Sequence, residues 1–414
     1  MSDLFAELEW RGFVHHATQG IGTQLAAEPR AVYCGFDPTA PSLQLGNLMP
    51  IMLLRHFQLA GHRPIVLMGG GTGLIGDPSG KRGERPLLSK EQIRENLQRQ
   101  RDQMARLLDF DGPAPALVLN NADWLAKQSL VDFLRDVGKH FSVNIMLQKE
   151  SVKARLDTGI SYTEFSYMLL QAFDFLHLFR ERHCTSQVGG SDQWGNITAG
   201  IDLIRRVEGG EAHGLVAPLV TMASGAKFGK TEAGAIYLDP ALTSPYKFYQ
   251  FWFNVDDRDV EAYLKLFTLL PRQDIEALMK THQKDPSRRD AQARLATEVT
   301  TMAHGKQALA GVVEASAALF GDRAVETNKL DALEAHAPTT KVGVRPETVV
   351  DALVVSRLAK SKSEARRLIK QGGVYVNDRR VADVDEKVRP DDWRGTKLVL
   401  RKGKKDYHLL SVDG

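Results

Sequence analysis

The sequence predicts an α/β protein with a doubly wound parallel sheet, followed by a helical domain and a small α+β module. Three observations predict this order. Short apolar runs alternate with helical periodicity in the first half of the chain, strand signals fade after Leu238, and a helix–strand pattern begins near Arg345. Because open α/β sheets bind ligands at the carboxyl ends of their strands, we expect a site at that edge.

Four short apolar runs are the expected strands of the sheet. They are residues 31–36, 64–68, 116–119 and 185–188, and a helix is expected over 48–59. The mostly helical stretch 124–156 lies between two of these strands and is therefore an insertion. Its apolar residues fit either interior packing or a dimer surface, and the sequence does not decide between them.

The second half of the chain divides by composition. Residues 244–320 are expected to form successive helices, and the polar stretch after them contains Pro338 and Gly343. The expected domains are a sheet domain over 1–232 with a helical insertion near 125–160, a helical domain over 233–320, a linker over 321–345 and a small module over 346–414.

Composition indicates an ordinary globular protein with a large core. The 414 residues are 43% hydrophobic and 25% charged, as in typical globular proteins. Two cysteines, Cys34 and Cys184, are too few for a disulfide framework and fit a reducing compartment. We find no signal-peptide pattern at the N-terminus and no apolar run near the length of a membrane span. We therefore expect a cytoplasmic enzyme.

Charge is distributed unevenly along the chain. Residues 356–405 contain 16 Lys and Arg against 7 Asp and Glu, whereas the remaining residues contain 38 against 44. Such segregation indicates a polyanionic partner for the basic tail. The alternative is a solvated basic face without a partner.

Two short loops carry the strongest chemical signal. Residues 187–196 read QVGGSDQWGN after an apolar run, so Gly189 and Gly190 allow a close approach of backbone to a ligand. Residues 227–231, which we term the lysine loop, read KFGKT and place two lysines and a hydroxyl on a short turn. Together they predict a nucleotide site closed by a mobile basic loop. In isolation, the lysine loop is equally compatible with a surface turn.

Two further turns follow expected strands. The first strand leads from Tyr33 to Asp37 and into a Pro- and Gly-containing turn before a helix, a pattern that is weak alone. The second strand ends in residues 69–81, GGGTGLIGDPSGK, which lack the glycine–lysine–hydroxyl spacing of a Walker loop. In that loop Asp77 supplies a fixed negative charge suited to an ammonium group. Lys81 and nearby Arg85 fit phosphate contacts or a solvated loop.

A helix is expected to begin at about Tyr162. Ser161 and Glu164 have the spacing of a capping box. Three hydrogen-bonding residues then fall on one face of an otherwise apolar helix, at positions i, i+4 and i+7: Tyr167, Gln171 and Asp174. Such groups are costly to bury without partners. Either they satisfy one another, or they line a polar pocket.

These motifs resemble those of bacterial tyrosyl-tRNA synthetases. The resemblance rests on GGSDQWGN, KFGKT, the helix TEFSYMLLQAFDF, the turn YCGFDPTAPSL and the segment SPYKFYQFW, and it extends from about Phe5 to the C-terminus. It implies a Rossmann-like class I catalytic domain. It also implies a tyrosine–tRNA ligase, in which tyrosine attacks the α-phosphate of ATP and the tyrosyl group then moves to the 3′ end of its tRNA.

The resemblance further implies Mg²⁺ with the ATP phosphates and a homodimer whose interface includes the insertion near 125–160. No protein metal site and no membrane association are expected. The implied tyrosine-binding residues are Tyr33 and Asp174 at the phenol, Asp77, Tyr167 and Gln171 at the ammonium group, and Gln193 on the carboxylate side.

The resemblance also assigns residues to ATP and to the departing pyrophosphate. The implied ATP-binding residues are Cys34, Gly35, Asp37, Gly46, Asn47, Gly190, Asp192 and Lys230, with Asp192 on the ribose hydroxyls. The implied catalytic residues are Thr39, Gln44, Asn47, Lys81, Arg85, Lys227, Lys230 and Thr231. No covalent nucleophile is required, because positioning and charge stabilisation carry this chemistry.

The chain departs from the family pattern at one position. The class signature His-x-Gly-His is replaced here by Gln44-Leu45-Gly46-Asn47. Glutamine can donate to a phosphate oxygen, but it is neutral and more flexible than imidazole. The departure therefore bears on the rate of tyrosine activation and not on the type of reaction.

The basic tail contains a short amphipathic helix. We expect Ser363 to start it, Gly372 and Gly373 to end it, and a strand to follow over 374–377. Ala365, Leu368 and Ile369 form its apolar side, and Arg366, Arg367 and Lys370 spread over the other as the expected tRNA-binding residues. The pattern resembles a small RNA-binding module also found in a ribosomal small-subunit protein.

Two alternatives are open at this stage. The first is a catalytically impaired, synthetase-like RNA-binding protein, which the substitution at Gln44 would favour. The second is an enzyme that activates tryptophan. Tyr33 with Asp174 argues against it, because an indole has no phenolic hydroxyl to pair with them.

Overall fold

The structure is a computed structural model that describes residues 3–79, 88–157, 159–225, 227–231, 234–320, 338–377, 379–403 and 406–412. The chain forms two compact units. The sheet unit consists of Met1–Leu238 and Asp256–Ala291, and the tail unit consists of Asp239–Val255 and Gln292–Gly414. The helices of the expected 233–320 domain are thus shared between two compact units, and the division by function remains a prediction.

The sheet unit is built on a six-stranded, mostly parallel sheet. Its strands are β1 (His16–Ala17), β2 (Ala31–Phe36), β3 (Arg63–Met68), β4 (Leu117–Asn120), β5 (Cys184–Gly190) and β6 (His213–Ala217). The spatial order is β1-β6-β5-β2-β3-β4, and only the edge strand β1 is antiparallel to its neighbour. The predicted parallel sheet is therefore confirmed, with β1 and β6 as strands that the sequence analysis missed.

The strand order reverses beside β2. The chain passes from β2 to β3 and β4 on one side, then returns to place β5 and β6 on the other. Tyr33 in β2 consequently lies between Ile65 in β3 and Gln187 in β5. The carboxyl ends of β2 and β5 meet at this switch point, where open α/β sheets bind their ligands.

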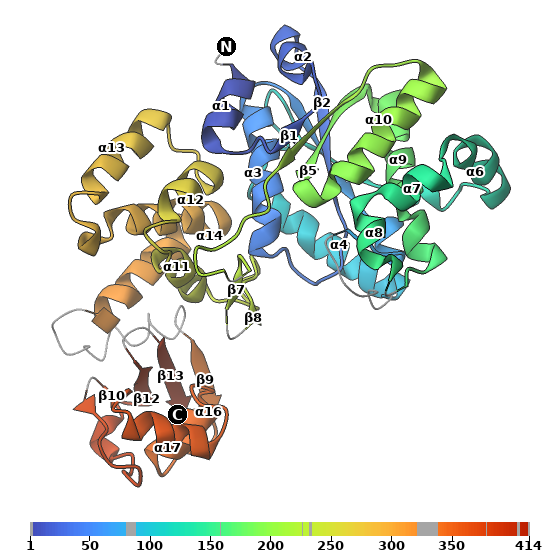
Figure 1. Cartoon of the computed structure of the whole chain (residues 1–414). Helices are drawn as coiled ribbons and strands as arrows, with labels where there is room; N and C mark the ends of the chain where they lie inside the picture. The colour runs from blue at the N-terminus through green and yellow to red at the C-terminus, as the bar shows by residue number, and fades with distance from the viewer. Residues whose placement is uncertain are drawn as a thin grey trace. The chain divides into compact units, whose positions relative to one another are not determined.

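Helices cover both faces of the sheet (Figure 1). On one face, α9 (Tyr162–Arg182) and α10 (Trp194–Glu208) share a core cluster with Tyr33 and Leu67 of the strands. The opposite face is covered by α3 (Leu45–Leu59), which contacts β2, β3 and β5. Because side chains alternate along a strand, this arrangement buries both sides of β2 and β3.

The remaining helices of the sheet unit frame this core. They are α1 (Leu4–Arg11), α2 (Ile21–Ala27), α4 (Lys90–Met104), α12 (Val260–Phe267) and α13 (Arg272–His282). Where the insertion is expected, the chain forms α5 (Ala122–Leu125), α6 (Leu130–Asp136), α7 (Val143–Gln148) and α8 (Glu150–Leu156). A small hairpin begins at the end of the lysine loop, where β7 (Lys230–Thr231) pairs with β8 (Gly234–Ala235).

The start of α9 is as predicted. The Ser161 hydroxyl accepts a hydrogen bond from the Glu164 backbone N–H at 3.3 Å. The Glu164 carboxylate was expected to complete a capping box, but it forms a buried ion pair with Arg155 of α8 at 2.9 Å. The residue expected to complete a capping box therefore ties the insertion to α9.

The tail unit contains α11 (Pro245–Phe253), most of α14 (Asp290–Phe320) and a small mixed sheet. Its sheet order is β11-β10-β12-β13-β9, from β9 (Thr339–Val342), β10 (Val374–Val376), β11 (Arg379–Arg380), β12 (Lys397–Lys402) and β13 (Asp406–Val412). Together with α16 (Val349–Val355) and α17 (Lys362–Lys370), this sheet confirms the predicted α+β module. Among the described helices, none is both long and apolar enough to cross a bilayer.

Candidate active site

A cavity of about 460 Å³ opens at the switch point of the sheet. It is walled by the carboxyl ends of β2 and β5, the first turn of α3 and one face of α9. The predicted residues that line it are Tyr33, Cys34, Gly35, Asp37, Thr39, Gly46, Asn47, Asp77, Tyr167, Gln171, Asp174, Gly190, Asp192 and Gln193. The fold thus brings the entire predicted tyrosine-binding set into one cavity, together with most of the ATP-binding set.

The inner end of the cavity holds a tyrosine hydroxyl beside a carboxylate. Tyr33 is fully buried, its ring meets Phe175 edge-on at 5.2 Å between centroids, and its hydroxyl has no hydrogen-bond partner among the described residues. Burial, with the charge of Asp174 second, raises the pKa of Tyr33 well above its ordinary value. A protonated, unpaired hydroxyl here is costly unless a ligand binds it.

Asp174 is held in place by two residues that the sequence analysis missed. Its carboxylate accepts hydrogen bonds from Asn121 Nδ2 at 2.9 Å and from Trp124 Nε1 at 2.7 Å. Burial raises the pKa of Asp174 to about 7, and these two hydrogen bonds act against the rise. Two donors fix the carboxylate's orientation, and its remaining acceptor capacity suits a ligand hydroxyl.

A second polar cluster surrounds Asp77. Gln193 Nε2 donates to the Asp77 carboxylate at 2.6 Å, and the Ser79 backbone N–H donates to its other oxygen at 2.9 Å. Gln171 Nε2 donates to Gln193 Oε1 at 3.2 Å, and Asn196 Nδ2 donates to Gln171 Oε1 at 3.0 Å. The amide of Gln193 is therefore turned toward Asp77. A fixed carboxylate among amide oxygens is suited to an ammonium group.

The third polar cluster involves Tyr167 and Asp37. The Tyr167 hydroxyl donates to one Asp37 oxygen at 3.0 Å, and the Thr72 hydroxyl donates to the other at 2.8 Å. Burial, followed by the charges of Asp37 and Asp77, raises the pKa of Tyr167 well above its ordinary value. The sequence left two alternatives for the polar face of α9, pairing with protein groups or lining a pocket. Its side chains do both.

The outer part of the cavity has features that favour a nucleotide. A Cβ atom added at Gly35 or Gly46 would meet no atom within 4 Å, so backbone borders open space there. A flat ring can approach such backbone closely. Burial raises the pKa of the nearby Cys34 thiol to about 12, so this cysteine is not a nucleophile at neutral pH.

The first turn of α3 presents Asn47 to the cavity but not Gln44. The Gln44 backbone N–H donates to Asn47 Oδ1 at 2.9 Å, which orients the Asn47 amide and leaves Nδ2 as a donor. Gln44 itself is not among the residues lining the cavity and forms a β-bridge with Tyr237. The N-terminus of this 15-residue helix adds a partial positive charge that favours phosphate.

Of the predicted cations, Lys227 and Lys230 are described by the structure, and neither lines the cavity. Lys227 and Lys230 are exposed. The Thr231 backbone pairs with Gly234 in the β7–β8 hairpin. Lys81 and Arg85 lie outside the described residues. In the part of the chain that the structure describes, no group of three or more His, Cys, Asp or Glu could hold a metal ion.

The site prediction missed several polar residues, among them Asn121 and Gln187, which line the cavity, and Trp124 and Asn196, which donate hydrogen bonds to residues that line it. Asn121 follows the carboxyl end of β4, and Gln187 lies in β5 with a buried Oε1 that has no partner among the described residues. The strand-end rule could have identified Asn121. The contact of Trp124 with Asp174 spans 50 residues, and no local pattern predicts it.

In the tail unit, α17 presents the predicted basic residues. Arg366, Arg367 and Lys370 are exposed, whereas Ala365 and Ile369 are buried. The helix begins at Lys362, one residue earlier than predicted, because the Ser361 hydroxyl accepts from the Glu364 backbone N–H at 3.2 Å and caps it. Ser363, the predicted start, is a helical residue.

Comparison with known proteins assigns the chain to a family. Residues 25–321 match the family of tRNA synthetases class I (W and Y), and residues 329–410 match the tyrosine–tRNA ligase SYY-like C-terminal domain. The chain is 52% identical to the tyrosine–tRNA ligase of Roseiflexus castenholzii, with 100% of both chains covered. It is 49% identical to tyrosine–tRNA ligase 1 of Bacillus subtilis, covering 99% of this chain and 100% of the relative.

The fold is similar to that of a solved synthetase. A C-terminally truncated mitochondrial tyrosyl-tRNA synthetase of Aspergillus nidulans superimposes with a TM-score of 0.71 and 31% identity, covering 77% of this chain and 95% of that one. Full-length identity to tyrosine-specific relatives removes the tryptophan alternative and confirms the predicted activity. The chain therefore belongs to the tyrosine–tRNA ligase family of class I tRNA synthetases and joins tyrosine to tRNA.

Proposed function

We propose that the inner end of the cavity selects tyrosine by its phenol. The observation that carries this proposal is the buried hydroxyl of Tyr33, which has no partner among the residues that the structure describes, beside the oriented carboxylate of Asp174. The substrate hydroxyl would accept from Tyr33 and donate to Asp174. Phenylalanine would leave both groups unpaired, which is how such a site rejects it; the tyrosine enzyme is the standard example of this effect.

The substrate ammonium group would bind among Asp77, Tyr167 and Gln171. Asp77 supplies the charge, and the network through Gln193 and Asn196 holds that carboxylate in position. With both ends of tyrosine fixed, its carboxylate points toward the nucleotide part of the cavity. One carboxylate oxygen then attacks the α-phosphorus of ATP, and pyrophosphate leaves.

The ligase uses ATP as its energy source, and we propose where ATP binds. Asp192 would hold the ribose hydroxyls, with Cys34 beside the ribose and Gly35, Gly46 and Gly190 bordering the nucleotide. Mg²⁺ would enter with the ATP phosphates and offset their charge. No protein metal site is needed for it, because the phosphates themselves supply oxygen ligands.

The negative charge that develops on the phosphates would be stabilised by donors from several elements. The proposed set is Thr39, Gln44, Asn47, Lys81, Arg85, Lys227, Lys230 and Thr231. Lys227 and Lys230 are exposed in the structure, so their contribution requires the lysine loop to bring them to the phosphates. Such interactions made in the transition state raise the activation rate more than the substrate affinity.

The tail unit and the insertion are proposed to bind the macromolecular partners. The exposed Arg366, Arg367 and Lys370 of α17 would contact the phosphates of the tyrosine tRNA. In the part of the chain that the structure describes, eight of the fifteen exposed large hydrophobic residues lie between 130 and 162, and we term them the apolar patch: Leu130, Val131, Leu134, Val143, Ile145, Leu147, Leu156 and Tyr162. Because such a concentration marks an interaction surface, the patch supports a homodimer through the insertion.

The functional division that we propose follows these sites. A catalytic domain over 1–232 includes the dimer insertion near 125–160, a helical domain covers 233–320, a linker covers 321–345, and an RNA-binding module covers 346–414. We also propose a cytoplasmic location, because Cys34 and Cys184 are both free thiols and tRNA charging supplies the ribosome.

Tyrosine-dependent exchange of pyrophosphate into ATP tests the proposed site. We expect exchange with tyrosine and none above background with tryptophan or phenylalanine. Asp174→Asn should reduce exchange through a higher KM for tyrosine, with the KM for ATP little changed. If the Asp174→Asn protein keeps the tyrosine KM of the parent, Asp174 does not contact the phenol and the proposed orientation is wrong.

A further inference from the structure

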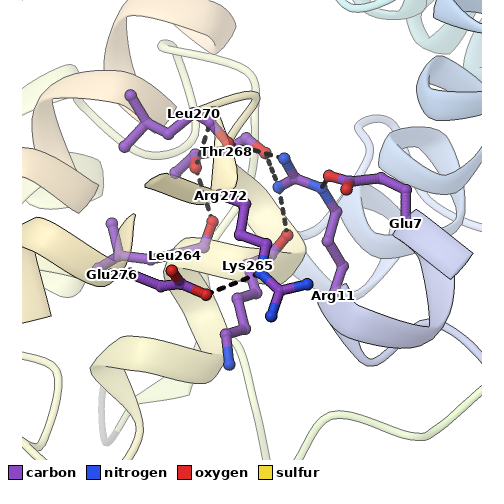
Figure 2. Close-up of polar contacts among 8 residues, drawn as sticks. All are labelled: Glu7, Arg11, Leu264, Lys265, Thr268, Leu270, Arg272 and Glu276. Atoms are coloured by element: carbon purple, nitrogen blue, oxygen red, sulfur yellow. Dashed lines mark hydrogen bonds and ion pairs between the residues drawn. The ribbon is translucent and has the colours of Figure 1, made fainter. Parts of the chain in front are cut away.

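A buried guanidinium joins two helices that are far apart in the sequence. Arg11, the last residue of α1, is only 4% exposed. Its Nη1 donates to the carbonyl oxygens of Lys265 at 2.9 Å and Thr268 at 3.0 Å, and its Nη2 donates to that of Leu270 at 2.7 Å. Its Nε donates to Glu7 at 2.7 Å, so all three guanidinium nitrogens form hydrogen bonds (Figure 2).

These three carbonyls lie at the end of α12 and in the turn that follows it. The last carbonyls of a helix have no partner within the helix and carry partial negative charge. A buried cation that donates hydrogen bonds to all three carbonyls both satisfies them and fixes the position of the helix end. Since α12 has only eight residues, its own hydrogen bonds are too few to hold it there.

The aromatic side chains of α12 hold the lysine loop. The Phe228 ring lies parallel to that of Phe267, with centroids 5.1 Å apart and an angle of 7° between the planes. It also meets Tyr263 nearly at right angles at 5.2 Å. The Tyr263 hydroxyl donates to the Thr221 carbonyl at 3.0 Å, and Thr221 forms a β-bridge with Lys227. The base of the loop is therefore attached to α12 at two points.

The other side of the loop touches the start of α3. Gly229 has a φ of +73°, and a Cβ atom there would lie 2.9 Å from Cβ of Leu45. The Gly229 carbonyl also accepts from the Ile236 N–H at 2.9 Å. Gly46 and Asn47, which line the cavity, follow Leu45 directly. A shift of α12 would consequently move the loop relative to the nucleotide part of the cavity.

We propose that Arg11 is a positioning residue for tyrosine activation, acting through α12 and Phe228 on the lysine loop. This inference rests on the proposed role of Lys227 and Lys230 at the phosphates. Because those lysines act on the transition state, loss of Arg11 slows adenylate formation and leaves tyrosine affinity unchanged. Misplacement of a catalytic group by about 1 Å from a distant change can cost about 100-fold in rate.

Single-turnover formation of tyrosyl-adenylate tests the inference with Arg11→Met, Phe228→Leu and the double variant. We expect each single variant to slow the step by about tenfold or more. Tyrosine Kd should stay within about twofold, and the double variant should be about as slow as the slower single variant. Losses that multiply in the double variant, or a parallel loss of tyrosine affinity, would overturn the proposal.

Two further variants separate positioning from folding. Arg272→Met is the matched control, because Arg272 is 60% exposed, pairs with Glu276 and donates to none of the three carbonyls. It should keep the parent rate. If Arg11→Met does not fold, Arg11→Lys keeps the charge without the fork and should still be slowed. Amide hydrogen exchange over Lys227–Lys230 should quicken in the Arg11 variant, and unchanged exchange would contradict the proposed route.

Lys230→Ala distinguishes failure of this inference from failure of the proposed function. If Lys230→Ala retains the parent activation rate, the lysine loop has no role at the phosphates and the inference falls with it. If Lys230→Ala is slow while Arg11→Met and Phe228→Leu are not, the loop acts on the phosphates independently of α12. In that case only the route from Arg11 is wrong.

Discussion

At the scale of single residues, the hydroxyl of Tyr33 has opposite effects on the stability of the free protein and on tyrosine binding. It is buried without a partner among the described residues, so it destabilises the free protein and is useful only when a ligand pairs with it. Tyr33→Phe should therefore stabilise the free protein by about 1–3 kcal/mol in urea unfolding. The same change should raise the KM for tyrosine. A variant that is less stable and binds tyrosine normally would contradict this interpretation.

The carboxylate of Asp174 should make tyrosine binding depend on pH. Its pKa in the free protein is raised to about 7. A phenol that donates to the ionised form favours ionisation, so tyrosine affinity should fall as the pH drops below 7, by up to about tenfold per unit. Tyrosine Kd measured by equilibrium dialysis between pH 5.5 and 8 checks this, with Asp174→Asn expected to give a flat profile.

The raised pKa of Asp174 should affect the stability of the free protein in the opposite direction, because this stability should fall as the pH rises, whereas tyrosine affinity should increase. Because the folded-state pKa of Asp174 lies above its ordinary value of 3.8, the free protein gains most from this group below pH 4. That contribution is lost as the pH rises through 7. In urea unfolding without ligand, the parent protein should therefore weaken relative to Asp174→Asn between pH 4 and 7. If the free energy of unfolding of the parent rises relative to that of the variant over this range, other groups in the folded protein stabilise the ionised Asp174 carboxylate.

Gln44 replaces the first histidine of the class signature, and its effect on the rate of tyrosine activation can be measured directly. It caps α3 through its backbone, and its side chain does not line the cavity. Gln44→His should raise the tyrosine-dependent exchange rate without changing tyrosine affinity, because a cationic donor would be gained at the phosphates. Gln44→Ala is the companion variant. If both variants match the parent, this position does not act on the reaction.

At the scale of elements, sequence patterns predicted the features that depend on neighbouring residues, such as the polar face and the first residue of a helix. The 3.6-residue period placed Tyr167, Gln171 and Asp174 on one face of α9, and Ser161 marked its first residue correctly. In the tail, Ser361 has a glutamate three residues later and Ser363 does not, so the capping rule itself indicated the true start of α17. The sequence was sufficient there, although the prediction chose the wrong serine.

Contacts between distant elements could not be predicted in this way. The strand β6, HGLVA, was missed because a histidine and a glycine interrupt its apolar pattern, yet all five residues are buried between β1 and β5. The bond from Trp124 to Asp174 and the fork of Arg11 on α12 join residues 50 and more than 250 positions apart. Periodicity carries no information about such pairs, because they depend on how the elements pack.

The exposed arginines of α17 give a prediction for that element. Arg366→Ala with Arg367→Ala should weaken tRNA charging, seen as a higher KM for tRNA, and leave tyrosyl-adenylate formation intact. Removing two phosphate contacts should also make the KM less dependent on salt. The matched control is Arg258→Ala with Arg272→Ala, two exposed arginines of the sheet unit. Equal loss in both steps of the reaction would contradict a role confined to tRNA.

At the scale of the whole molecule, the charge and the apolar surface lie in different parts of the chain. The excess of positive charge lies within residues 356–405, whereas more than half of the exposed large hydrophobic residues that the structure describes lie within 130–162. A polyanion would thus be attracted to one part and a second protein surface to another. The two partners need not compete for the same surface.

The apolar patch allows a direct test of the homodimer. Val131 in α6 is 71% exposed in the single chain. In a two-fold symmetric dimer one substitution appears twice across the interface, so Val131→Glu would place two like charges in an apolar contact. Sedimentation should show the parent at twice the chain mass and the variant at the mass of one chain. Leu59→Glu, at a position 57% exposed outside the patch, should stay dimeric. If Val131→Glu also remains at twice the chain mass, the dimer forms through a different surface.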